Sequence, residues 1–343
     1  MTQHIPVDVA LADKVAFLGA AESHSVERPG QVEAVETHMS WVFLTDRFAY
    51  KLKKPLCHPL NDLRSLAARR RNSLVEVHLN QRLARNVYLG VRPLTLVEGT
   101  AMLRLGGDGS VVDWLVGMRR LPQPLMLDNA LRSGGPERAD LDRVALTLAR
   151  FYAGLAFEPV APAARRRWFE QEIELCSLEL GRTEFGLDAT RIEGLVGRLR
   201  DFLRARPEML IERHREGRIV EGHGDLRPEH VCLEREPKII DCLEFSRRLR
   251  LIDPADELAF LALECAMLDQ PGAGERLQRS YETIAGDRPP APLIAWYTGC
   301  RALLRARLSA LHSREPGARP PQAWLGQAKR YLDAGLAHTD DLS

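Results

Sequence analysis

The sequence has few lysines, no closely spaced cysteine pair and no long apolar run. Its six cysteines are scattered without a Cys-x-x-Cys pair, which argues against a disulfide framework or a zinc site and favours a reducing, cytoplasmic location. No stretch approaches the roughly 18 apolar residues of a transmembrane helix, and the first residues lack the basic region of a signal peptide. We therefore expect no membrane partner.

Neither sign of charge is in excess. The chain carries 48 basic and 47 acidic residues, a net charge of +1, which gives no support for a nucleic-acid partner. Its 45% hydrophobic and 28% charged residues are typical of a folded globular protein. A length of 343 residues suits two domains or one large two-lobed domain.

The lysines that are present gather in one place. Only six of the 48 basic residues are lysines, and three of these, Lys51, Lys53 and Lys54, lie within four positions. An ammonium group is a compact point charge that a guanidinium does not reproduce at a tight phosphate site. The cluster is either a phosphate-binding feature or a solvated basic turn, and Lys51 and Lys53 share one face of the strand expected there.

Hydrophobic periodicity divides the chain into a β-rich first third and a helical remainder. Alternating and β-branched residues predict a hairpin at residues 40–44 and 48–53 and three further strands at 87–96, 101–105 and 111–119. Helical periodicity predicts one helix between them, at residues 62–85. The Leu-Pro-Gln-Pro run at 121–124 breaks this pattern, and helical periodicity then dominates from residue 140. We therefore predict an α+β protein with a β-rich N-lobe, residues 1–120, and a larger helical C-lobe, residues 121–343.

Two acidic residues stand out within the C-lobe. Asp225 follows His223-Gly224, and Asp241 ends the apolar run Lys238-Ile239-Ile240, so a hairpin between them would bring the two carboxylates together. A carboxylate at the end of a buried strand requires a cationic partner or a metal ion. Paired acids suit metal-assisted phosphoryl transfer, with a lysine from the 51–54 cluster on the phosphates and Glu76, on the following helix, to orient it.

Three motifs in order carry a family resemblance. His223-Gly224-Asp225, Ile240-Asp241 and the run 253–259 (Asp-Pro-Ala-Asp-Glu-Leu-Ala) resemble the catalytic loop, the metal-binding Asp and a helix start of the aminoglycoside phosphotransferase-like, or choline kinase-like, branch of the protein-kinase fold. Ala49-Tyr50-Lys51 is similar to the Ala-x-Lys of the third kinase strand, whereas Glu257 stands in place of the second Asp of the helix motif. Residues 36–42 and 118–122 look like a largely uncharacterised bacterial subgroup.

The resemblance implies a bilobal protein-kinase-like fold and an ATP- and Mg²⁺-dependent transfer to the hydroxyl of a small-molecule acceptor. It implies that Asp225, with His223 beside it in the catalytic loop, orients and deprotonates that hydroxyl, and that Asp241 holds the metal. The motifs do not identify the acceptor, the oligomeric state or the choice between ATP and GTP.

The same resemblance assigns the nucleotide contacts. Lys51 would reach the phosphates and pair with Glu76, with Lys53 as the other candidate lysine on that face. The adenine would meet backbone groups of the segment that joins the lobes, at Met118, Arg119 and Arg120.

One position departs from the family pattern. Five residues after Asp225 the family has a metal-binding Asn, and this sequence has His230. A neutral imidazole fits Mg²⁺ poorly and suits Mn²⁺ better, so His230 would change the metal preference of the site or only close the turn before Val231. Two alternatives to an active kinase follow. The chain would be a nucleotide-binding pseudo-kinase, or a metallophosphohydrolase with ligands from His223, Asp225, His230 and Asp241.

Overall fold

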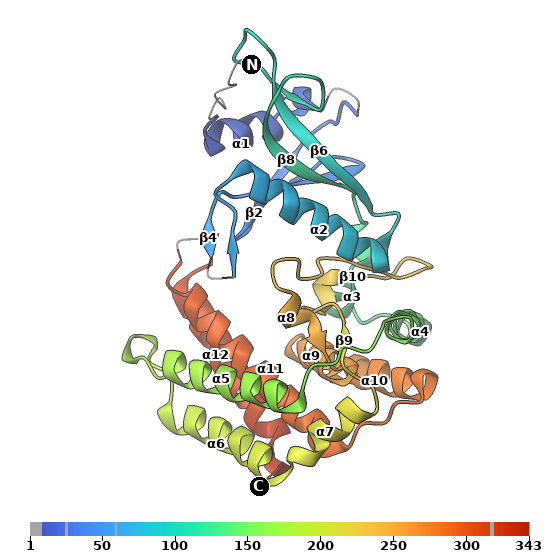
Figure 1. Cartoon of the computed structure of the whole chain (residues 1–343), viewed down its shortest axis with the longest axis vertical. Coiled ribbons are helices and arrows are strands. Elements are labelled where there is room, and N and C mark those ends of the chain that lie inside the picture. Colours follow the sequence, from blue (N-terminus) through green and yellow to red (C-terminus); the bar gives the residue numbers. More distant parts are fainter. Residues whose placement is uncertain (1–8, 25–26, 59, 316–318, 343) are drawn as a thin grey trace. The chain divides into compact units, whose positions relative to one another are not determined.

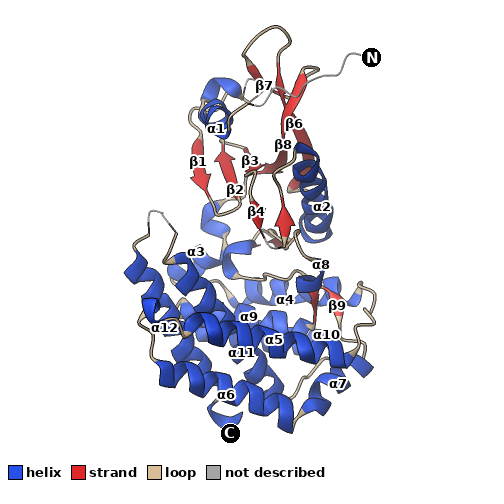
Figure 2. Ribbon diagram, turned by 60° about the vertical axis from the view of Figure 1, so that its left-hand side comes forward, coloured by secondary structure: helices blue, strands red, loops and turns tan. Residues whose placement is uncertain are grey.

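The chain forms two compact units in the computed structural model, which describes residues 9–24, 27–58, 60–315 and 319–342. The β unit contains residues 1–125 and 238–247, and the helical unit contains residues 126–237 and 248–343 (Figures 1 and 2). The β unit thus extends to residue 125 and includes residues 238–247, whereas residues 121–343 were predicted together as a C-lobe. Residues 238–247 belong to the β unit because strand β11 (Lys238–Ile239) packs against helix α2 (Leu66–Ala84) of that unit. The N–H of Cys242, just after β11, also donates to Asn80 of this helix.

An antiparallel sheet of order β1-β2-β3-β8-β6-β7 forms the body of the β unit. Its strands are β1 (Glu33–Glu36), β2 (Ser40–Leu44), β3 (Phe48–Lys53), β6 (Tyr88–Leu96), β7 (Leu103–Leu105) and β8 (Ser110–Arg119). The unit also contains two helices and a short hairpin, namely α1 (Leu11–Gly19), α2 (Leu66–Ala84), β4 (Cys57–His58) and β5 (Asn61–Asp62). β2 and β3 coincide with the predicted hairpin, whereas β1 was not predicted as a strand because its four residues are all exposed and show no apolar alternation.

Alternation along β3 decides what lies on each face of the sheet. Tyr50 and Leu52 pack in the cluster that includes Leu18 of α1. Ala49 packs in a second cluster with Val77 of α2, and the intervening lysines of β3 point to this same α2 side. The two-residue period of the strand is therefore enough to place Lys51 and Lys53 on the α2 side of the sheet.

Buried ion pairs attach α2 to the sheet. Ser65 caps its first turn, and Arg69 makes two hydrogen bonds, of 2.7 and 3.0 Å, to the carboxylate of Asp113 on β8. Lys14 of α1 donates to the same carboxylate over 2.8 Å. All three charged groups are nearly inaccessible to water, so each depends on the others for its solvation.

The helical unit consists of helices with short strands between them. The helices are α3 (Leu127–Arg132), α4 (Arg138–Ala153), α5 (Pro162–Leu180), α6 (Ala189–Ala205), α7 (Pro207–Arg215), α9 (Pro254–Met267), α10 (Pro271–Ala285), α11 (Ala291–His312) and α12 (Pro321–His338). β9 (Val220–Glu221) pairs antiparallel with β12 (Leu251–Ile252), β10 covers Val231–Cys232, and α8 (Arg247–Arg250) begins at the last residue of the β unit. α7 was not predicted, because its sequence is rich in charge and has few apolar positions. Within the described ranges no helix has the length and apolar character needed to span a bilayer.

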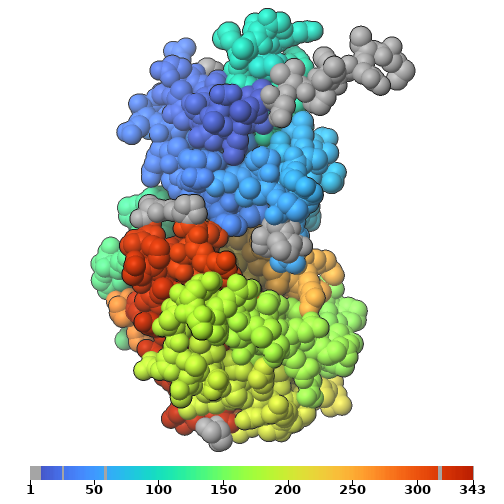
Figure 3. Space-filling model, turned by 90° about the vertical axis from the view of Figure 1, so that its left-hand side faces the viewer, coloured from blue at the N-terminus to red at the C-terminus, as the bar shows by residue number. Residues whose placement is uncertain are grey.

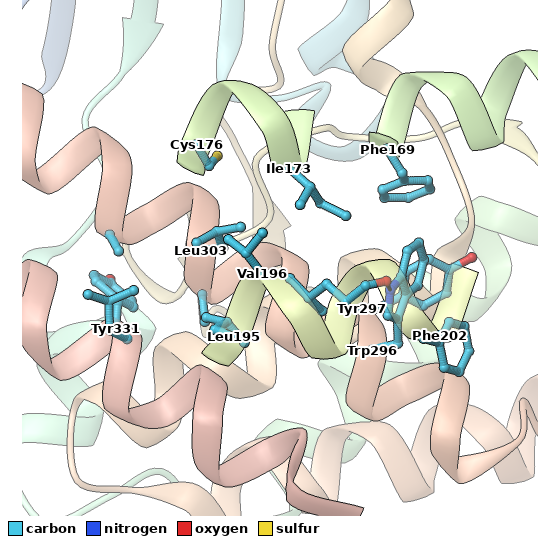
Figure 4. Close-up of a cluster of buried hydrophobic side chains, with 14 of the residues drawn as sticks. Phe169, Ile173, Cys176, Leu195, Val196, Phe202, Trp296, Tyr297, Leu303 and Tyr331 are labelled. Atoms are coloured by element: carbon cyan, nitrogen blue, oxygen red, sulfur yellow. Dashed lines mark hydrogen bonds between the residues drawn. The ribbon is translucent and has the colours of Figure 1, made fainter. Parts of the chain in front are cut away.

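An aromatic cluster forms the centre of the helical unit (Figure 4). Trp296 of α11 stacks on Phe202 of α6 at 5.1 Å between ring centroids and meets Phe169 of α5 edge-on at 4.6 Å. The buried indole N–H donates to the Leu199 carbonyl over 3.1 Å, so its polar atom is satisfied. Figure 3 shows α5 and α6, in yellow-green, beside the red C-terminal residues on one face of this unit.

Truncation of Phe202 should destabilise this unit strongly. We expect Phe202→Ala to lower the free energy of unfolding by about 3–5 kcal/mol, because the stacked ring is lost and its neighbours cannot close the cavity. The matched control is Phe157→Ala, since Phe157 is 41% exposed. Chemical denaturation followed by tryptophan fluorescence measures both variants, and equal losses would refute this view of the core.

Candidate active site

Lys51 lies between two carboxylates. Its ammonium donates to Glu76 Oε1 of α2 and to Asp241 Oδ1, both over 2.9 Å. The contact between Lys51 and Glu76 that the family resemblance implied is thus present, and Asp241 lies against the same ammonium. The three residues come from a strand, a helix and the segment after β11, all within the β unit.

Glu76 is shared by two lysines. Its second oxygen, Oε2, accepts from Lys53 over 2.5 Å, and Lys53 also donates to Glu244 over 2.7 Å. The two lysines differ in access to solvent, because the side chain of Lys51 is 15% exposed and that of Lys53 only 1%. Glu244, three residues after Asp241 in a polar run, is therefore paired with a buried lysine.

Lys51 and Glu76 each favour the charged form of the other. Burial alone would lower the pKa of Lys51, but Asp241, Glu76 and Glu244 outweigh it and hold this pKa well above its usual value. Burial likewise opposes ionisation of Glu76, yet Lys51 and Lys53 lower the pKa of its carboxyl below the usual value. The carboxylate is therefore charged at neutral pH although it is completely buried.

The backbone around Asp241 is held in an uncommon conformation. Asp241 has φ of +61°, in the left-handed region that residues other than glycine rarely adopt. Its N–H donates to the hydroxyl of Tyr88 over 3.2 Å, and the next N–H, of Cys242, donates to Asn80 Oδ1 over 2.9 Å. The side chain of Asp241 is 44% exposed, so it remains in contact with solvent.

The predicted catalytic loop lies in the helical unit, where a buried carboxylate holds its backbone. Glu257 of α9 accepts from the N–H of His223 over 3.1 Å, from the N–H of Gly224, and from the hydroxyl of Tyr152 over 2.5 Å. A Cβ on Gly222 would lie 2.7 Å from the same carboxylate, so the loop passes Glu257 where only glycine fits. Glu257, which replaces the Asp of the family motif, thus fixes the backbone that precedes Asp225.

The carboxylate of Asp225 is paired with a neighbour in its own loop. Arg227 Nε and Nη2 lie 3.1 and 3.0 Å from Asp225 Oδ2, and Nη1 of the same side chain bonds Glu229 over 2.5 Å. Burial would raise the pKa of Asp225, but the positive charges of Arg227 and Arg305 lower it below the usual value. Sequence reasoning missed this use of Arg227, and the only available signal was its position two residues after the acid.

Both ring nitrogens of His230 have partners. Nδ1 lies 2.8 Å from the carbonyl oxygen of Asp225, and Nε2 lies 3.2 Å from Nη2 of Arg227. A carbonyl only accepts and a guanidinium only donates, so these contacts require the proton on Nδ1 and a lone pair on Nε2. His230 therefore holds the turn of its own loop, and a metal at Nε2 would have to displace Arg227.

The segment predicted to meet adenine is part of the sheet. Met118 pairs with Ala49 and Tyr88 in the two flanking strands. The N–H of Arg119 donates to the Val87 carbonyl and the N–H of Arg120 to the Arg47 carbonyl, each over 2.8 Å. These two N–H groups already have acceptors, so an adenine would have to use carbonyl groups here or the residues that follow.

The predicted residues thus form two groups. Lys51, Glu76 and Asp241 meet in the β unit, whereas His223, Asp225 and His230 share one loop of the helical unit. In the described part of the chain no group of three or more His, Cys, Asp or Glu side chains is arranged to hold a metal ion. Asp241 is the predicted metal ligand, and its side chain is 44% exposed.

Sequence comparison gives relatives of unknown activity. No family model matches the chain. Uncharacterised proteins of Mycobacterium bovis and Mycobacterium tuberculosis are 31% identical to it over 327 residues. The alignment covers 93% of this chain and 62% of each relative, so the chain spans about three fifths of the length of the curated relatives it matches.

Solved structures identify the fold. A choline/ethanolamine kinase family protein from Mesorhizobium loti matches with a TM-score of 0.55 at 15% identity, over 91% of this chain and 92% of the other. The GDP complex of aminoglycoside 2'-phosphotransferase-IIIa matches with a TM-score of 0.52 at 17% identity, over 91% and 93%. A Plasmodium vivax ethanolamine kinase also gives 0.52, at 9% identity over 88% and 82%. The chain has the α+β, bilobal protein-kinase-like fold of the aminoglycoside phosphotransferases and choline/ethanolamine kinases, and this prediction is confirmed.

Replacing Glu257 by Gln should loosen the loop that carries Asp225. The amide of Gln has one accepting oxygen, so its NH2 group would face one of the backbone N–H groups that now donate to Glu257. Because two donors cannot bond each other, the free energy of unfolding should fall by about 1–3 kcal/mol. We also expect faster amide hydrogen exchange at His223 and Gly224. Tyr152→Phe is the control, because it removes one donor and leaves both backbone bonds. An equal acceleration of exchange in the control would contradict the role of Glu257.

Proposed function

We propose that this protein is a kinase that transfers the γ-phosphoryl group of a magnesium-bound nucleoside triphosphate to the hydroxyl of a small molecule. The observation that supports this most strongly is the ammonium of Lys51, held between Glu76 and the solvent-exposed Asp241. A lysine aimed by a buried acid, next to an exposed carboxylate, is the arrangement that phosphoryl transfer uses for the triphosphate and its metal. The hydrolase alternative gives this cluster no role.

Lys51 rather than Lys53 is the phosphate-binding lysine of this proposal. Its ammonium lies beside the exposed carboxylate of Asp241, whereas Lys53 is enclosed between Glu76 and Glu244. When phosphates arrive, Lys51 can exchange one carboxylate partner for a phosphate oxygen and keep the other.

Asp241 would hold the magnesium. Mg²⁺ keeps several waters and binds through one or two carboxylates together with substrate phosphates, so a single exposed carboxylate fits it. When bound, the ion would neutralise negative charge on the phosphates. The chain's own part is to keep the Asp241 carboxylate at the protein surface, through the bonds to Tyr88 and Asn80.

Asp225 would orient the acceptor hydroxyl and accept its proton. Its lowered pKa keeps it ionised at neutral pH, and Glu257 fixes the loop that carries it, with His223 as a packed member of that loop. A nucleotide-binding protein without turnover is the second candidate, because Arg227 already occupies this carboxylate. The aminoglycoside phosphotransferase neighbour was solved with GDP, so binding and turnover should be tested with both ATP and GTP.

Substitution of Asp241 should impair magnesium-dependent nucleotide binding, whereas substitution of Asp225 should impair turnover. Asp241→Asn should abolish the gain in nucleotide affinity that magnesium provides, because its carboxylate is assigned to the ion. Asp225→Asn should leave nucleotide affinity within about twofold and lower turnover by about 10²- to 10⁴-fold, because it removes a general base. Calorimetric titration with ATP or GTP, with and without Mg²⁺, gives the first quantity. Phosphoryl transfer to a panel of hydroxylated small molecules or to water gives the second, and equal loss of binding in both variants would contradict the assignment.

His230→Asn tests the departure from the family pattern. If the imidazole contributes to the metal site, this change should shift the preference from Mn²⁺ toward Mg²⁺, because an amide oxygen is the harder ligand. The measurement is nucleotide affinity with each metal in turn, with His214→Asn, a histidine on α7, as the control. An unchanged preference would leave His230 with its structural role in the turn alone.

A further inference from the structure

The second lysine of β3 has no role in the function proposed above. Lys53 is 1% exposed, and its ammonium joins two carboxylates, Glu76 on α2 and Glu244, three residues after Asp241. A buried ammonium is costly unless it is paired, and here the pairing connects three separate parts of the β unit. With Glu76 and Glu244 on either side, Lys53 is enclosed and cannot serve phosphates.

The connection through Glu244 reaches the segment that carries Asp241. Without a ligand, Asp241 is held through its side chain by Lys51 and through its N–H by Tyr88. Binding of the carboxylate to a metal, and of Lys51 to phosphates, would remove the first of these bonds. Asp241 is a non-glycine residue in the left-handed region, and such a conformation persists only where the surroundings enforce it.

We infer that Lys53 and Glu244 form a positioning pair for Asp241. The pair keeps the Asp241 carboxylate in place for the metal when Lys51 exchanges its bond to Asp241 for a bond to the phosphates. Lys51 is then the exchangeable member of the β3 pair, and Lys53 is the permanent partner of Glu76. This inference rests on the proposed kinase function, and it assigns to Lys53 and Glu244 an effect on the metal without contact to it. Partners of metal-binding carboxylates have this effect in general, and their loss weakens metal affinity by about 10- to 100-fold.

The decisive variant is Glu244→Ala. It cuts the connection to the Asp241 segment and leaves Lys53 paired with buried Glu76, so the fold of the β unit is retained. We expect the Mg²⁺ concentration that half-saturates ATP or GTP binding to rise about 10- to 100-fold, with nucleotide affinity in EDTA unchanged. Lys53→Met should raise the same concentration, and Lys51→Met should instead weaken nucleotide binding both with and without magnesium.

Lys54→Met is the matched control. Lys54 follows Lys53 directly and pairs with exposed Glu36, so its loss should leave the magnesium requirement unchanged. A wild-type magnesium requirement in folded Glu244→Ala would overturn the inference, as would an equal loss of nucleotide affinity with and without Mg²⁺. Failure of the wild-type protein to bind either nucleotide would instead refute the proposed function, so the two failures are distinguishable.

Discussion

The candidate site depends on one buried charge. Glu76 is completely inaccessible to water, and an ionised carboxylate in such a position is tolerated only if cations and hydrogen bonds replace the lost water. Lys51 and Lys53 supply both, one to each carboxylate oxygen. This requirement explains why two lysines lie two positions apart on the same face of β3. Each lysine also pairs with one more carboxylate, Lys51 with Asp241 and Lys53 with Glu244.

The helical unit solves a related problem with backbone groups. Glu257 is also inaccessible to water, and two N–H groups of the catalytic loop, with the Tyr152 hydroxyl, satisfy its carboxylate. A buried carboxylate that loses its main-chain donors is left unsatisfied, and this cost favours the observed backbone conformation of the loop. The two units thus each contain a buried acid beside a predicted site residue, Glu76 beside Lys51 in one and Glu257 beside the loop of Asp225 in the other.

Local patterns in the sequence predicted those parts of the protein that short-range physics decides. Alternation gave the β2–β3 hairpin and placed Lys51 and Lys53 on one face, and the ordered motifs indicated the kinase-like fold. The bonds of Tyr88 and Asn80 to residues about 150–160 positions away leave no periodic signal. The partners of Glu244 and Arg227 also stayed hidden, because a charged residue in a polar run has the same appearance whether it is solvated or paired. The N–H bonds of Arg119 and Arg120 depend on strand register, which composition does not reveal.

The central claim is that Lys51, aimed by Glu76 and next to Asp241, binds the phosphates of a nucleotide. Phosphorus NMR of ATP and of GTP, titrated with the protein in the presence of Mg²⁺, reports on those phosphates directly. The account predicts that the resonances of at least one nucleotide shift and broaden with the wild-type protein, and that Lys51→Met removes most of the effect while the protein stays folded. Identical spectra with wild-type and Lys51→Met protein would contradict it.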